Sequence, residues 1–111
     1  MEARIDLYNY KDRLKRKLES IKGLESISKD TKGKILKFQR DRIAEGIGHA
    51  RILRYLDDLP KLARLLDKEF EDATSEDFRR VLHDVEEMDL AEASKTEFKK
   101  TIKVFFKWIN G

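Results

Sequence analysis

The sequence predicts an all-helical (all-α) fold, a compact bundle of four to five helices, and three observations support this fold class. Apolar residues recur at intervals of three and four along most of the chain, which is the pattern of amphipathic helices. One proline and five glycines are too few for the tight turns of a strand-rich sandwich. No segment shows the alternation of apolar and polar residues that is typical of a half-buried strand. The length of 111 residues suits one domain, so we expect residues 1–111 to form a single one.

The leading segment, residues 1–23, is expected to hold the first helix over residues 10–22. Asn9 and Asp12 have the spacing of a capping box, in which a side-chain acceptor is followed three residues later by an acid. Gly23 can adopt the left-handed conformation that commonly ends a helix. The apolar stripe of this helix consists of Leu7, Tyr10, Leu14, Leu18 and Ile21.

Residues 28–66 predict a first helical hairpin, whose opening helix begins near Ser28 or Asp30. Both residues are good N-caps, because their side chains accept hydrogen bonds from the free N–H groups of a first turn. This helix is expected to end at Gly46, which opens a short elbow with Gly48. Ile35, Phe38, Gln39 and Ile43 share one face of this helix.

The second helix of this hairpin is expected from His49 to Leu66. Pro60 lies inside it and removes one backbone donor, so we expect a kink or break near Leu56. The apolar stripe follows a regular spacing of three and four residues. It consists of Ile52, Tyr55, Leu59, Leu62, Ala63 and Leu66.

Residues 74–110 predict a second helical hairpin. Thr74 is expected to cap its first helix, with Asp77 three residues later, and Ser94 to cap its second, with Glu97 completing a capping box. The buried face of the first helix consists of Phe78, Val81, Leu82, Val85 and Met88. That of the second consists of Phe98, Ile102, Phe105, Phe106 and Ile109.

Charge is abundant and unevenly distributed along the chain. Charged residues make up 42%, well above the roughly 25% of average domains, so most outward faces carry charge. Residues 67–93 contain eleven acids and three bases, whereas residues 94–111 contain five bases and one acid. Two interpretations remain open at this point. The basic segments form a face for a polyanion, or the opposite charges mingle on a solvated surface.

Several functional classes are disfavoured by composition. The absence of cysteine excludes disulfides and cysteine-based zinc or redox sites. No apolar run approaches the roughly 18 residues of a membrane span, and residues 1–22 lack the apolar stretch of a signal peptide. We therefore expect a cytoplasmic protein without a membrane partner.

Catalytic and cofactor chemistry also finds little support. The two histidines, His49 and His83, do not form a His-Glu-x-x-His zinc motif, and there is no glycine-rich phosphate loop. The carboxylates of residues 67–92 are better explained as an acidic surface than as a general acid and base. We expect no catalytic residues, no metal and no cofactor in this chain.

Two basic helix faces are the more informative features. In the last helix the lysines gather beside the apolar stripe, where like charges repel each other unless a partner supplies negative charge. These are Lys95, Lys99, Lys100, Lys103 and Lys107. Free N–H groups and hydroxyls at the expected helix start, over 94–96, favour a phosphate seat. The alternative is a set of solubilising lysines.

The start of the helix at 49–66 offers a matching surface with His49, Arg51 and Arg54. Arginine grips phosphate with two nitrogens or reads a guanine edge in the major groove. Alternatively, Arg54 forms an ordinary surface ion pair with Asp57 or Asp58. The aromatic residues lie on the core stripes and do not alternate with the lysines, which favours duplex DNA over a single strand stacked on aromatic rings.

Three motifs stand out in the chain: EGIGHARILRYL at 45–56, FEDATSED at 70–77, and SKTEFK at 94–99 followed by KVFFKWI at 103–109. Together they resemble the core-binding domain of tyrosine recombinases and phage-type integrases, and the highly charged leading helix is similar to that of archaeal members. The first resembles the family's glycine elbow and the helix after it, and the last its basic, phenylalanine-rich closing helix. The resemblance is clearest over residues 31–109.

The resemblance implies a helical bundle of the SAM-like type that forms half of a clamp around a recombination site. Its partners would be double-stranded DNA, its own catalytic domain and other recombinase protomers. Catalytic residues would then follow Gly111, so this chain is expected to be no enzyme by itself, and Tyr8, Tyr10 and Tyr55 do not suit the family's nucleophile. By position, the DNA-facing residues would be Gly48, His49, Arg51, Arg54, Ser94, Lys95, Thr96, Lys99, Lys100 and Lys103.

One position departs from the family pattern, because Arg51 stands where the family often has a hydroxyl residue.

A second functional hypothesis comes from a different class. In it, the chain is a helical protein–protein interaction module that docks through the acidic surface of residues 67–92.

Overall fold

The computed structural model describes the backbone of residues 2–111 and the side chains from Asn9 onward. It is 81% helical, with no strand among these residues, so the predicted all-helical class is confirmed. The α-helices are α1 (Glu2–Gly23), α2 (Lys29–Ala44), α3 (His49–Leu66), α4 (Ser75–Glu87) and α5 (Glu92–Ile109). A short 3-10 helix, η1 (Phe70–Asp72), lies between α3 and α4.

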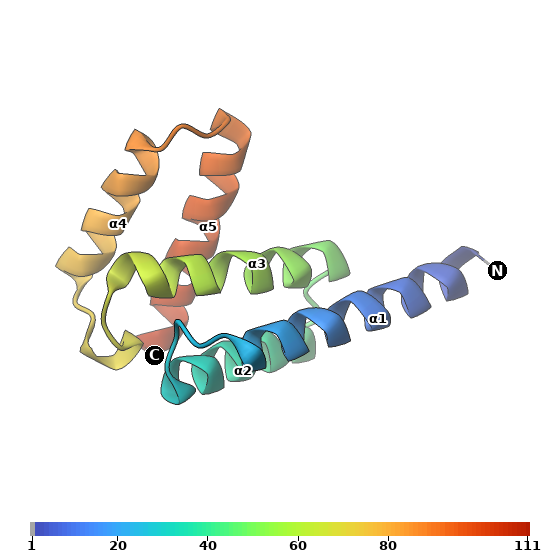
Figure 1. Cartoon of the computed structure of the whole chain (residues 1–111). Coiled ribbons are helices and arrows are strands. Elements are labelled where there is room, and N and C mark those ends of the chain that lie inside the picture. The colour runs from blue at the N-terminus through green and yellow to red at the C-terminus, as the bar shows by residue number, and fades with distance from the viewer. Residues whose placement is uncertain (1) are drawn as a thin grey trace.

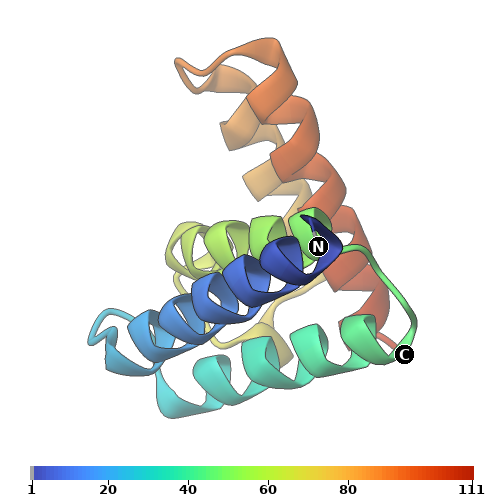
Figure 2. The same ribbon diagram turned by 90° about the vertical axis from the view of Figure 1, so that its right-hand side faces the viewer.

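Helix α3 occupies the centre of the fold. Helices α1 and α2 run alongside it, while the hairpin of α4 and α5 stands at a steep angle on its other side (Figures 1 and 2). Every other α-helix packs on α3, and ten of its 18 residues are buried. Ile52, Leu59 and Leu62 are fully enclosed. The bounds predicted for this helix are thus confirmed, and its extensive burial follows from its central position.

An aromatic cluster joins the two hairpins. Phe38 of α2 is fully buried and meets Tyr55 at 5.1 Å, Phe105 at 5.2 Å and Trp108 at 5.3 Å between ring centroids. All three pairs are edge-to-face, the arrangement that brings the positive edge of one ring to the negative face of another. Phe70 of η1 adds a fourth contact, 4.6 Å from Phe105.

Two of the predicted caps are present. The Ser28 hydroxyl accepts the Thr31 N–H at 3.1 Å at the start of α2. Thr74 and Asp77 form the complete capping box of α4, with the Thr74 N–H donating to Asp77 at 2.9 Å. This hydrogen bond, with another from Lys68, lowers the pKa of Asp77 to about 2.

The other two predicted capping boxes are wrong, because both helices begin earlier than expected. Helix α1 begins at Glu2, so Asn9 lies inside it. Helix α5 begins at Glu92 with Ala91 as its N-cap, so Ser94 lies in its first turn. Neither stretch contains a proline or glycine that would stop the helix from extending upstream.

Several helix ends and interiors also differ from the predictions. Gly23 ends α1 without a left-handed backbone, and α2 ends at Ala44, two residues before the left-handed Gly46 (φ 82°). Helix α3 continues unbroken through Pro60, which is itself buried. Tertiary packing around α3 therefore outweighs the one hydrogen bond that proline removes. Ile43, in the last turn of α2, is 41% exposed, and the side chain of Leu7 lies outside the described residues.

The molecule is somewhat elongated. Its radius of gyration is 14.4 Å, against about 13 Å expected for a compact chain of this length. The N-terminal half of α1 accounts for this, because it extends past the start of α3 (Figure 1). The start of α3 nevertheless lies between two neighbours, α1 and α5, and this placement determines the geometry of the candidate site.

Candidate nucleic-acid interface

The fold brings the start of α3 against the first turns of α5. Gly48, His49, Arg51, Arg54 and Glu97 line one shallow hollow on this side of the molecule. Arg54 donates to the Ser94 carbonyl at 3.3 Å, which ties the two helices together. The structure thus places Gly48, His49, Arg51 and Arg54 around one hollow, and it brings Ser94, 40 residues further along the chain, against Arg54.

The N-terminus of α3 is an electropositive end without a side-chain cap. Its N-cap is Gly48, which has no side chain to accept a hydrogen bond, and its first turn contains no acid. The first N–H groups of the helix therefore point outward with the positive end of the helix dipole, a favourable place for a phosphate. His49 is exposed there, and its ring stacks on Tyr10 of α1, 3.8 Å between centroids.

A single carboxylate is shared by two of the predicted DNA-facing cations. Glu97 accepts from Arg51 at 2.6 Å, and Lys100 lies 3.4 Å from its other oxygen. The hydrogen bond from Arg51, followed by the charges of Arg51 and Lys100, lowers the pKa of Glu97. Two cations against one acid leave a net positive charge. Glu97 therefore pairs with the basic cluster and takes no part in the cap that we predicted.

Arg54 is held by a buried acid. Of the two partners considered, the structure selects Asp58, 3.1 Å away, while Asp57 pairs with Lys17 of α1. Asp58 is only 2% exposed and also accepts the Thr101 hydroxyl at 2.7 Å. Burial raises the pKa of Asp58, and the hydrogen bond from Thr101 and the charge of Arg54 offset this only in part.

Thr101 is a functional neighbour that sequence reasoning missed. It lies 43 residues from Asp58 and sits on the buried face of α5. The available signal was a hydroxyl residue on an apolar helix stripe, a position where a partner for its hydrogen bond is needed.

Two of the predicted DNA-facing lysines point elsewhere. Lys95 is buried and donates to the Glu86 carbonyl of α4 at 2.8 Å, and Lys99 pairs with the Glu86 carboxylate. Both side chains lie on the flank of α5 that packs against α4. Lys95 and Lys99 therefore hold the hairpin together and do not join the cluster around Glu97.

The phosphate seat predicted at residues 94–96 loses two of its donors, the Lys95 N–H and the Thr96 hydroxyl. Because α5 begins at Glu92, the Lys95 N–H already bonds the Ala91 carbonyl at 3.0 Å. The Thr96 hydroxyl donates to the Glu92 carbonyl at 3.0 Å. The outward stripe of α5 still carries Thr96, Lys100 and Lys103, all exposed. Lys103 forms no ion pair with any side chain from Asn9 onward, so its charge is available to a partner.

Other kinds of site find no geometric support in the described part of the chain. No group of three His, Asp or Glu side chains there is arranged to hold a metal ion. None of the described helices combines the length and the apolar character needed to cross a membrane. His83 is exposed on α4 and lies near Asp84 and Glu87.

Comparison with known proteins found no match: no protein-family model, no curated protein and no solved structure matches the chain.

We expect Thr101→Val to destabilise the fold by about 1–3 kcal/mol, because it leaves the buried Asp58 carboxylate with one hydrogen-bond donor fewer. The pKa of Asp58 should rise further. Because the pKa of Asp58 in the folded variant then lies higher, the loss of unfolding free energy should be largest at pH values above this pKa. The loss should become smaller in acid, where Asp58 is protonated. Urea unfolding at several pH values and a carboxyl NMR titration measure both effects.

Thr96→Val is the matched control, because its hydroxyl is exposed and bonds only a backbone carbonyl. It should change the free energy of unfolding by less than about 0.5 kcal/mol. Equal costs for the two variants, or an unchanged pKa of Asp58, would show that the Asp58–Thr101 bond does not link α3 to α5.

Proposed function

We propose that this chain is a duplex-DNA-binding domain, the SAM-like core-binding part of a cytoplasmic tyrosine recombinase or integrase. Its own catalytic domain and other protomers would complete a clamp around the recombination site. The observation that carries this proposal is the uncapped start of α3, flanked by His49, Arg51 and Arg54 and lying beside Lys100 of α5.

The geometry suggests that different groups of this surface contact different parts of a duplex. The free N–H groups at the start of α3 and the Arg51 guanidinium suit phosphate oxygens, and Lys100 and Lys103 add point charges along the next turns of α5. Arg54 is aligned by Asp58, which orients its planar group for recognition of a base edge. Lys95 and Lys99 pair with α4 and are therefore left out of the proposed DNA contacts. The proposed contacts are Gly48, His49, Arg51, Arg54, Lys100 and Lys103. Ser94 and Thr96 lie at the edge of this surface.

Glu97 acts in this proposal as an internal substitute for phosphate. In the free protein its carboxylate neutralises part of the charge of Arg51 and Lys100. A DNA phosphate would take its place, so both cations would exchange one anionic partner for another. Because the contacts with Glu97 are lost when the phosphate binds, the affinity for DNA is lower than the number of cations alone suggests.

The alternative, a protein-interaction module that uses the acidic surface of residues 67–92, is less well supported. Several of its acids have partners within the chain. Glu69 accepts from Ser28 and Thr31, Asp77 caps α4, and Glu86 pairs with Lys99. These carboxylates contribute to the fold and are less available for docking than their number indicates.

A salt titration tests the DNA-binding proposal. With about five phosphates neutralised, the logarithm of the affinity for a mixed-sequence duplex should fall against the logarithm of salt with a slope near −4.5. Fluorescence anisotropy between about 50 and 200 mM salt measures it. Lys103→Ala should reduce the slope by about one. The control Lys29→Ala, at the far end of α2, should leave the slope unchanged. An affinity that does not depend on salt would refute the proposal.

Glu97→Gln should tighten binding of the same duplex by roughly three- to tenfold at low salt, because it removes the anion that competes with phosphate. Glu76→Gln is the matched control: it removes the same charge from the exposed face of α4. Equal effects of the two variants would mean that only net charge matters. Weaker binding by Glu97→Gln would show that Glu97 positions the cations and does not compete for them.

A further inference from the structure

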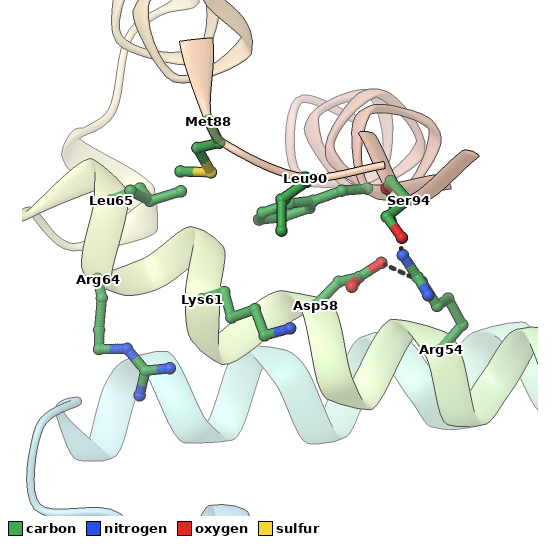
Figure 3. Close-up of a pocket in the computed structure, with 9 residues that line it drawn as sticks. Arg54, Asp58, Lys61, Arg64, Leu65, Met88, Leu90 and Ser94 are labelled. Atoms are coloured by element: carbon green, nitrogen blue, oxygen red, sulfur yellow. Dashed lines mark hydrogen bonds and ion pairs between the residues drawn. The ribbon is translucent and has the colours of Figure 1, made fainter. Parts of the chain in front are cut away.

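A second surface lies on the same side of α3 but nearer its C-terminal end. A cleft of about 480 Å³ opens between α3 and the turn that joins α4 to α5. Its apolar side is formed by Leu65, Met88, Leu90 and Phe98, and its polar edge follows α3 (Figure 3). The volume falls in the range of about 300–1,000 Å³ that binding pockets typically have.

The apolar side of the cleft contains an unusual exposed residue. Leu90 is 45% exposed and stands in the short turn between α4 and α5. Met88, half-buried beside it, has a flexible side chain that adapts well to different partner surfaces. Burial of these two side chains by a partner would remove apolar area from water, which favours association.

The polar edge of the cleft is cationic. Arg54, Lys61 and Arg64 follow one another along α3, with Asp58 buried beneath Arg54. Lys61 and Arg64 are exposed and form no ion pair with any side chain from Asn9 onward. At 1.5 Å per residue, the row from Arg54 to Arg64 is about 15 Å long. A small anion would engage one of these charges, whereas a segment with several carboxylates would engage the row.

We infer that this cleft binds an acidic amphipathic peptide segment. The apolar side chains of such a segment, spaced three and four residues apart on a helix, would cover Met88 and Leu90. Its acids would face the row of cations on α3. This is the helix-in-groove mode of recognition. Charge complementarity selects the acidic partner. The site lies apart from the proposed DNA contacts except at Arg54 and Ser94, which border both.

A fluorescein-labelled helical peptide of about 16 residues, with leucines on one face and glutamates on its flank, is the probe. A scrambled peptide of the same composition is its control. We expect the patterned peptide to bind the full chain at least about tenfold more tightly than the scrambled one. Leu90→Ala should weaken binding about tenfold. Ile43→Ala, which truncates another exposed large apolar side chain, should leave binding unchanged.

Charge reversal makes the test more specific. Lys61→Glu should weaken binding of the glutamate peptide and restore binding of a peptide in which lysines replace the glutamates. Binding of duplex DNA should change much less than with Lys103→Ala, so failure of the peptide site is distinguishable from failure of the DNA surface. Equal binding of the scrambled peptide would overturn the inference. Self-association of the chain through Leu90 would also overturn it, and so would burial of Leu90 by bound duplex DNA.

Discussion

The structure depends on the enclosure of α3. Because every other α-helix packs on it and ten of its 18 residues are buried, α3 cannot slide or rotate without opening the whole core. The same enclosure keeps the helix continuous through Pro60, where the local sequence favours a break. Its two ends and its one outward stripe are therefore fixed relative to α1 and α5. The proposed DNA surface is a direct consequence of how the core is packed.

A buried polar network completes this arrangement. Asp58 links Arg54 on its own helix to Thr101 on α5, and each hydrogen bond has a defined geometry. Apolar contacts alone tolerate small sliding between helices, whereas a buried carboxylate requires its donors in place. Burial raises the pKa of Asp58. The ionised carboxylate is therefore less favourable in the folded protein than in water, and this lowers the free energy of unfolding at neutral pH. In return, Arg54 is aligned and the register between α3 and α5 is set.

Local signals were sufficient for much of the fold. Periodicity identified α3 with both of its ends, and side-chain chemistry identified Ser28 and the Thr74–Asp77 pair as caps, because both depend on residues close in sequence. The starts of α1 and α5 were missed since no breaker marks them. The direction of Lys95 and Lys99 was missed for another reason. A helical wheel gives the angle of a side chain but does not reveal which neighbouring helix covers that flank.

The candidate site shows the same limit. The cations Arg51 and Lys100 could be selected from composition and spacing, but the pairing of Arg51 with Glu97 could not, because these two residues are 46 apart in the chain. The local sequence pattern predicts that Glu97 caps its own helix. Only the packing of α5 on α3 shows that it faces Arg51. The charges that appear unopposed in the sequence are thus partly neutralised in the fold, and the proposed DNA surface is smaller than the sequence indicates.

The central claim is that the start of α3 and the outward stripe of α5 form one DNA-binding surface. An NMR titration of the isotope-labelled chain with a short mixed-sequence duplex, at low and then moderate salt, tests it most directly. The account predicts shifts at the amides of residues 48–54 and around Lys100 and Lys103, smaller shifts at Lys95 and Lys99, and a loss of all of them as salt rises. No shifts at low salt, or shifts confined to residues 67–92, would contradict it.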